Sequence, residues 1–244
     1  MKNQATDGQA GEVRLRAEFD LLADEYHEQH KANVAITGEG PEYFAEYKVA
    51  DLAALMRARG GAAESILDFG SGIGNSVPYF RKYFEKSELY CGDVSARSIE
   101  IARARFGGDE KYLLIGGGIP LPAQSMDVVF SACVFHHIPH EEHQHWLREL
   151  RRVTRPGGVL VIYEHNPLNF LTVQAVNTCA LDVNAKLIRG GAMRQSALES
   201  GWGEARVDYR LFFPASLKRL RPLERYLGWL ALGAQYRMAA RCPA

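Results

Sequence analysis

The segment Ile66-Leu67-Asp68-Phe69-Gly70-Ser71-Gly72-Ile73-Gly74-Asn75 decides the fold of this chain. It begins as a short apolar strand, turns at three glycines and leads into a helix that the pattern predicts over residues 75–85. Glycines at such a corner let the backbone turn tightly and approach a ligand that a Cβ atom would exclude. The free amides at a helix start also favour a carboxylate or a phosphate. The segment therefore predicts a ligand-binding corner between a buried strand and a helix.

Short apolar runs alternate with helical stretches on either side of this corner. The pattern predicts buried strands at 66–69, 89–91, 112–115, 128–131 and 159–163, and helices at 75–85, 95–106 and 141–153. Strands that alternate with helices need right-handed crossovers and give a parallel sheet covered on both faces. We therefore expect a Rossmann-like α/β fold.

The two ends of the chain have other patterns. Two amphipathic helices are predicted before the first strand, at 13–30 and 42–57, and a further helix is predicted at 169–189. Strands at 206–213 and 234–240 flank a helical insertion at 215–232 that Pro222 breaks. These strands should close one edge of a seven-stranded, mostly parallel sheet, one of them antiparallel. We expect an N-terminal helical lid, residues 1–60, and a core with a C-terminal cap, residues 61–244.

An acidic side chain, Asp93, follows the second predicted strand. An acid a little over 20 residues past the glycines can accept hydrogen bonds from both hydroxyls of a ribose. Asp93 could instead cap the next helix, a role that Ser95 could also fill. A dinucleotide motif places its third glycine at position 75, where this chain has Asn75. The third glycine is Gly74, which favours S-adenosylmethionine over a nicotinamide dinucleotide.

The pattern continues in register beyond the second strand. The further segments are Ile119-Pro120-Leu121-Pro122, Met126-Asp127-Val128-Val129-Phe130, Phe135-His136-His137-Ile138 and Leu150-Arg151-Arg152-Val153-x-Arg155-Pro156-Gly157-Gly158. With the glycine corner and Gly92-Asp93-Val94-Ser95 they cover residues 62–165. In this order and spacing they resemble the class I S-adenosylmethionine-dependent methyltransferases of the type 11/12 domain, and small-molecule O-methyltransferases among them. The resemblance implies this fold, S-adenosylmethionine as cofactor and methyl transfer as the activity.

The resemblance also implies individual cofactor contacts. The residues around Gly70 would hold the methionine part, Asp93 the ribose and Val94 the adenine. Family members usually have an adenine-contacting acid where this chain has Ile115, so adenine recognition should rely on backbone groups and packing. A tyrosine of the lid would close over the cofactor. The expected cofactor-binding residues are Asp68, Gly70, Ser71, Gly72, Asp93, Val94, Cys133 and Tyr26.

Candidate catalytic side chains follow the fourth and fifth predicted strands, at the edge where ligands bind in such sheets. His136 and His137 resemble the paired histidines of natural-product and sugar O-methyltransferases, where one serves as base. The two histidines could instead cap the next helix or fill a polar corner. Glu164 and His165 end the fifth strand, and they could instead belong to a polar turn shaped by Pro167. The neighbouring histidines at 140, 143 and 145 lack a cysteine or carboxylate at ligand spacing, so no metal is expected.

Composition narrows the partners. Lys plus Arg and Asp plus Glu number 29 each, so no net charge attracts nucleic acid. The first residues lack the apolar stretch of a signal peptide, and no apolar run approaches about 20 residues. We expect a cytoplasmic enzyme that methylates a small molecule, with a hydroxyl oxygen as the leading acceptor and a homodimer possible. The alternatives are an NAD(P)-dependent oxidoreductase and a non-catalytic protein that binds S-adenosylmethionine on the same fold.

Overall fold

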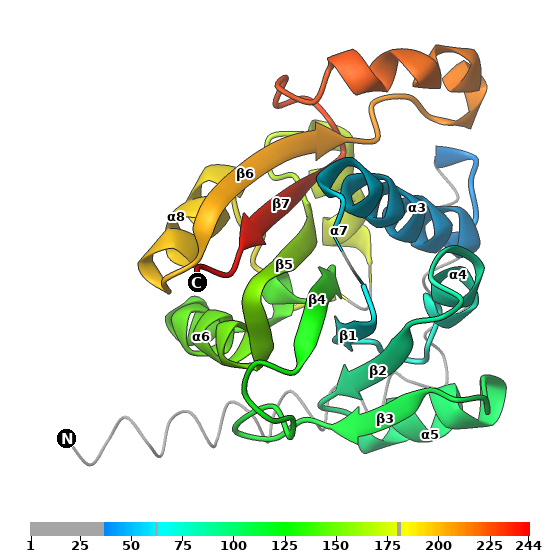
Figure 1. The fold of residues 1–244 in the computed structure, drawn as a ribbon. Coiled ribbons are helices and arrows are strands. Elements are labelled where there is room, and N and C mark those ends of the chain that lie inside the picture. Colours follow the sequence, from blue (N-terminus) through cyan, green and yellow to red (C-terminus); the bar gives the residue numbers. More distant parts are fainter. Residues whose placement is uncertain (1–36, 62, 180–181) are drawn as a thin grey trace.

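The computed structural model describes residues 37–61, 63–179 and 182–244. Within these residues seven strands form one sheet in the order β3-β2-β1-β4-β5-β7-β6 (Figure 1). The strands are β1 (Ser65–Phe69), β2 (Glu88–Asp93), β3 (Lys111–Leu114), β4 (Met126–Ala132), β5 (Thr154–His165), β6 (Gly203–Arg210) and β7 (Gln235–Arg241). β1 to β5 pair in parallel, whereas β7 is antiparallel to both β5 and β6. The mostly parallel seven-stranded sheet, closed at one edge by the two C-terminal strands, is confirmed.

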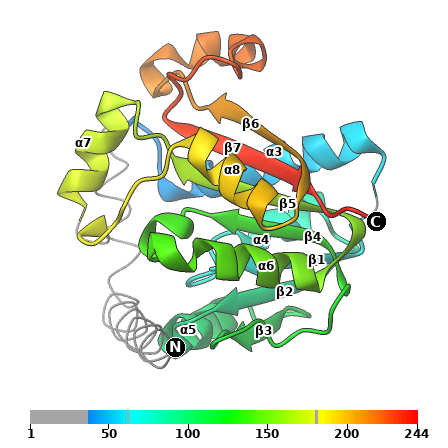
Figure 2. The same cartoon turned by 90° about the vertical axis from the view of Figure 1, so that its left-hand side faces the viewer.

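Helices cover both faces of the sheet (Figure 2). One face carries α3 (Pro41–Arg59), α4 (Val77–Tyr83) and α5 (Ala96–Arg105), and the other carries α6 (His143–Val153) and α8 (Gly190–Glu199). Side chains alternate along β5, as the period of a strand requires. Val161 and Tyr163 pack in the core beneath α3 and α4, whereas Leu160 and Ile162 pack in the core beneath α6. The sheet is thus buried on both sides, which explains its continuous apolar strands.

Helix α3 belongs to the first of these layers. Val49, Leu52 and Met56 are buried in its core, and the Tyr163 hydroxyl of β5 donates to Asp51 Oδ2 at 2.7 Å. The helix ends at Gly60, whose φ of 61° is the left-handed conformation that glycine adopts without strain. The predicted helix at 42–57 is confirmed, and the one at 13–30 lies outside the described residues.

The segment after β5 differs from the prediction. The single helix expected at 169–189 is wrong: α7 (Phe170–Thr178) is shorter, and α8 follows it. The Asn169 side chain begins α7 by accepting a hydrogen bond from the Thr172 amide at 2.9 Å. Gly190 begins α8 where a Cβ atom would lie 2.8 Å from Val207 Cγ1 of β6. The glycine therefore lets α8 pack directly on the sheet, a tertiary requirement that the local pattern does not reveal.

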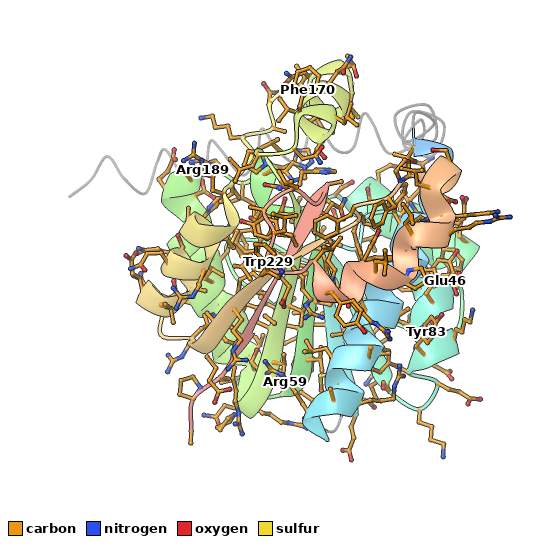
Figure 3. The ribbon with its side chains drawn as sticks, turned by 90° about the horizontal axis from the view of Figure 1, so that it is seen from above. Glu46, Arg59, Tyr83, Phe170, Arg189 and Trp229 are labelled. Carbon is orange, nitrogen blue, oxygen red and sulfur yellow. The ribbon has the colours of Figure 1, made fainter. Side chains whose placement is uncertain are left out.

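Short 3-10 helices complete the fold. They are η2 (Phe135–His137), η3 (His140–Glu142) and η5 (Ala215–Tyr226). η5 contains Pro222 and is shorter than the helical insertion expected at 215–232. The Arg221 guanidinium of η5 pairs with Glu39 at 2.7 Å and lies 4.5 Å from the centre of the Tyr43 ring. Seen from above, Phe170 and Trp229 lie on α7 and on the segment after η5 (Figure 3), and both are exposed. No helix in the described part of the chain is long and apolar enough to cross a membrane.

Candidate active site

The glycine corner after β1 has the backbone that the sequence predicted. Gly70 and Gly72 have φ of 77° and 51°, in the left-handed region. The amides of Gly70 and Ser71 donate to the Gly92 carbonyl of β2 at 2.8 and 3.0 Å. A Cβ atom at position 70 would lie 2.3 Å from Val134 Cγ2, while at position 72 it would meet no atom within 4 Å. Glycine is therefore required by packing at 70, and at 72 it leaves open space above the backbone.

Asp93 joins this corner to the end of β2. Its Oδ2 accepts from the Gly72 amide at 2.8 Å and its Oδ1 from the Ser95 amide at 2.9 Å. The helix-cap alternative for Asp93 is wrong, because Ser95 is the N-cap of α5 and its hydroxyl accepts from the Ser98 amide. The Asp93 carboxylate does not cap the helix and faces the corner, where the sequence predicted a ribose.

Two polar side chains beside the corner are buried with unmatched atoms. Asp68 is 2% exposed, and neither its Oδ2 nor the Ser71 hydroxyl has a hydrogen-bond partner among the described residues. Burial and the neighbouring Asp93 raise the pKa of Asp68 to about 7, although Lys48 opposes the shift. Buried polar atoms usually have partners. These two therefore indicate a site that a polar ligand completes.

A cavity of about 430 Å³ opens above the corner. This volume lies within the range of small-molecule sites. Residues from the ends of β1, β2, β3, β4 and β5, from α3 and from the segment after α7 surround it. They include Lys48, Asp68, Gly70, Ser71, Gly72, Asp93, Val94, Ile115, Cys133, His136, His137, His165 and Asp182.

Cys133 is one of the residues that line the cavity. Its φ of 59° is unusual for a residue with a side chain, and Lys48 Nζ of α3 donates to its sulfur at 3.4 Å. Burial alone would raise the pKa of the thiol, but Lys48 and His165 outweigh it and lower the pKa to about 7. Lys48, expected only as part of the lid, thus brings a positive charge into the cavity.

His136 and Glu164 form a buried pair on the other side of the cavity. His136 Nδ1 lies 2.5 Å from Glu164 Oε2, and each side chain is 1% exposed. Glu164 Oε1 accepts from the amides of Val134 and Phe135 at 2.9 and 2.7 Å. Burial opposes charge on both groups, yet their mutual attraction raises the pKa of His136 to about 10 and lowers that of Glu164. The amides of Val134 and Phe135 thus hold the Glu164 carboxylate against the His136 ring.

Asp182 reaches the same cluster from the segment after α7. Its Oδ1 lies 3.4 Å from His136 Nε2 and 3.5 Å from His137 Nε2. Burial raises the pKa of Asp182, but the hydrogen bond and charge of His136 outweigh burial and lower this pKa to about 2. For His137, burial and the charge on His136 both act in the same direction and lower the pKa to about 3. Sequence reasoning missed Asp182, since it follows no strand and fell inside the predicted helix at 169–189.

Of the remaining predicted residues, some line the cavity and others do not. The His165 ring lies 5.2 Å from the His136 ring and lines the cavity, as does Val94. Tyr26 lies outside the described residues. His143 donates or accepts only within the protein, with Nε2 3.0 Å from the carbonyls of Phe135 and Ile138. The sequence therefore located the cavity, including both histidine-bearing strand ends, while Asp182 was added by the fold.

A doubly wound sheet whose glycine corner and strand-end acid line one cavity defines a protein that binds a nucleoside-containing cofactor. Residues 67–162 match the family model of a methyltransferase domain. A solved S-adenosylmethionine-dependent methyltransferase of Thermotoga maritima superposes with a TM-score of 0.64 at 17% identity, covering 93% of this chain and 99% of that one. Residues 67–162 of this chain are therefore similar to a methyltransferase domain, and the fold is that of a solved S-adenosylmethionine-dependent methyltransferase. These matches give no support to the oxidoreductase alternative.

Curated relatives differ in the acceptor that their names state. A tRNA N(3)-methylcytidine methyltransferase of Drosophila melanogaster is 26% identical over 187 residues, which are 68% of this chain and 56% of that protein. A malonyl-[acyl-carrier protein] O-methyltransferase of Hahella chejuensis is 28% identical over 106 residues, 43% of this chain and 37% of that protein. The chain spans between 29% and 63% of the length of the curated relatives it matches.

Proposed function

We propose that this protein transfers the methyl group of S-adenosylmethionine to a hydroxyl oxygen of a small molecule. The observation that carries the proposal is that one cavity is lined both by the glycine corner with Asp93 and by the cluster of His136, His137 and His165. A cofactor held at the corner would present its methyl group toward the cluster. Alignment of the acceptor, the methyl group and the sulfur in such a cavity can supply several kcal/mol, up to about 7–11.

The cofactor half of the cavity fits a charged nucleoside. Asp93 would exchange its hydrogen bond from Gly72 for the ribose hydroxyls, and Gly72 leaves room for the ligand. Asp68 and the unmatched Ser71 hydroxyl would face the methionine part. Ile115 is buried and lines the cavity, so adenine would meet an apolar wall in place of a carboxylate.

The acceptor half supplies the base. Glu164 is occupied by two amides and His136, and His136 lies between Glu164 and Asp182, so both are positioning residues. His165 is less buried and borders the open cavity at the end of β5. In the proposed step the acceptor oxygen forms a bond to the methyl carbon as the carbon–sulfur bond breaks. The hydroxyl proton passes to the imidazole of His165, and S-adenosylhomocysteine is the leaving group.

A nucleic-acid acceptor is the competing assignment, because curated relatives are named as tRNA methyltransferases. Equal numbers of basic and acidic residues favour the small molecule. The experiment is a transfer assay with methyl-labelled S-adenosylmethionine and two acceptor pools, a metabolite extract and deproteinised total tRNA. We expect label in the metabolite fraction, as a methyl ether or ester. Label confined to tRNA would reject the small-molecule acceptor, and absence of S-adenosylhomocysteine binding by calorimetry would reject the function itself.

A further inference from the structure

His136, His137 and Asp182 lie together in the lining of the cavity. Nε2 of each histidine faces Oδ1 of Asp182, at 3.4 and 3.5 Å, and one potential ligand atom from each of the three residues lies within 4.8 Å of the others. Charge-assisted hydrogen bonds are typically about 2.7–2.9 Å long. Both distances to Asp182 Oδ1 are longer than this, so the three atoms form an open cluster and not close hydrogen-bonded pairs.

The spacing matches that of ligands around a cation. Nitrogen and oxygen ligands lie about 2.0–2.1 Å from Zn²⁺ in a tetrahedral site, which places neighbouring ligand atoms about 3.3–3.4 Å apart. Both distances to Asp182 Oδ1 are close to this edge length. Two imidazoles and one carboxylate are also a ligand set that suits Zn²⁺, Mn²⁺ and Fe²⁺ better than Mg²⁺ or Ca²⁺.

The outer hydrogen bonds are those that a metal-binding histidine needs. His136 bonds Glu164 through Nδ1, which leaves Nε2 directed at Asp182. Glu164 is itself fixed by the amides of Val134 and Phe135. A carboxylate behind the imidazole orients the ring and raises its basicity as a ligand. Glu164 would serve this purpose for His136.

We infer that His136 Nε2, His137 Nε2 and Asp182 Oδ1 bind one divalent transition-metal cation, with Zn²⁺ the best fit. Three protein ligands leave a coordination position toward the cavity that all three residues line. On the proposed function, an oxygen of the acceptor occupies that position, beside His165 and facing the cofactor methyl group. The acceptor would then be a molecule with a hydroxyl or adjacent oxygens able to coordinate a cation.

Metal titration tests the site without reference to activity. Tag-free protein, dialysed against EDTA and then freed of it, is titrated with Co²⁺ by visible absorption and with Zn²⁺ by competition against a chromophoric chelator. We expect one equivalent to bind with a low-coordinate Co²⁺ spectrum. Asp182→Asn and His137→Ala should each weaken binding at least 10-fold, and Glu164→Gln by about 10–100-fold. His145→Ala is the matched control, because this exposed histidine contacts the Gly117 carbonyl and does not line the cavity.

Folding and cofactor binding are measured on the same samples. Each variant must retain a cooperative thermal transition and S-adenosylhomocysteine affinity within a few-fold of the parent protein, and EDTA should leave that affinity unchanged. Absence of saturable 1:1 metal binding, or equal affinity in the parent, Asp182→Asn and His137→Ala proteins, would overturn the inference. Metal binding without S-adenosylhomocysteine binding would retain the metal site and reject the proposed function, so the two failures are distinct.

Discussion

Glu164 Oε2 lies 2.5 Å from His136 Nδ1 although the two residues are 28 positions apart. β4 and β5 are parallel neighbours, so their carboxyl ends meet at one edge of the sheet. His136 lies shortly after the end of β4, and Glu164 is the second-last residue of β5. Each of the two side chains is only 1% exposed. Register between two strands thus creates the charged pair that borders the acceptor half of the cavity.

Removal of this charge should be costly for the fold. Glu164→Gln removes the nearer of the two carboxylates that face the buried His136 ring, the other being that of Asp182. Breaking a buried pair from one side typically costs about 3–5 kcal/mol. Urea unfolding at pH 7 measures the loss. The control is Glu88→Gln, which removes an exposed partner of Lys111 and should leave stability nearly unchanged. Equal midpoints for the two variants would contradict a buried charged pair.

The two glycines of the corner should respond differently to alanine. At Gly70 the new Cβ collides with Val134 and the φ of 77° is strained, so we expect a loss of more than about 2 kcal/mol. At Gly72 no atom lies within 4 Å of the Cβ, so only the backbone cost of about 1–2 kcal/mol applies.

Cofactor binding separates them further. Gly72→Ala should remain folded yet bind S-adenosylhomocysteine at least 10-fold more weakly, because its methyl group enters the ligand space. Thermal unfolding and calorimetry provide the two readouts. If Gly72→Ala binds like the parent protein, the cofactor does not pass over this residue.

Local patterns predicted the elements that line the cavity, and tertiary contacts account for the rest. The corner at 66–75 and the acid at 93 follow from strand period, glycine conformation and spacing, which neighbouring residues determine. Asp182 and α8 depend on how the chain returns across the sheet after β5, and on the close approach of Gly190 to β6. The local sequence pattern of residues 169–189 shows neither the path of the chain after β5 nor the contact of Gly190 with β6. Lys48 was expected in the N-terminal lid from the resemblance, and only the packing of α3 against the sheet shows that it reaches Cys133.

Asp93 should contribute directly to cofactor affinity. Asp93→Ala removes acceptors for the ribose hydroxyls, and hydrogen bonds to a charged group are worth about 1.5–3 kcal/mol, or roughly 10–150-fold in dissociation constant. Calorimetric titration with S-adenosylhomocysteine measures the change. Asp109→Ala is the control, since this exposed acid follows α5 outside the cavity. A ribose bound elsewhere would leave the two variants with equal affinity.

The buried carboxyl of Asp68 should make the cofactor-free protein less stable as pH rises. Its folded pKa of about 7 exceeds the ordinary value of 3.8, so the folded state retains a proton that the unfolded chain releases. The stabilisation of the folded state by this retained proton is fully present below pH 4 and is lost as pH rises toward 7. The Asp68→Asn protein has no titrating group at this position, so its stability should not fall for this reason as pH rises.

Denaturant unfolding at pH 5 and pH 8 tests the sign. The stability of Asp68→Asn relative to the parent protein should be about 2–3 kcal/mol more favourable at pH 8 than at pH 5. Other titrating groups are common to both proteins and cancel in this comparison. A difference that is the same at both pH values would mean that Asp68 is ionised throughout, paired with Lys48.

His165 should affect turnover and leave cofactor binding intact. It borders the acceptor half of the cavity, and a positioned general base contributes about 10²–10⁴-fold to rate. We therefore expect His165→Gln to lower kcat by this range in the labelled-methyl assay, with S-adenosylhomocysteine affinity within a few-fold of the parent protein. His145→Ala, which removes an imidazole outside the cavity, should retain full turnover. If His165→Gln keeps the kcat of the parent protein, another group is the base. If it loses cofactor affinity in parallel with kcat, His165 belongs to the cofactor site.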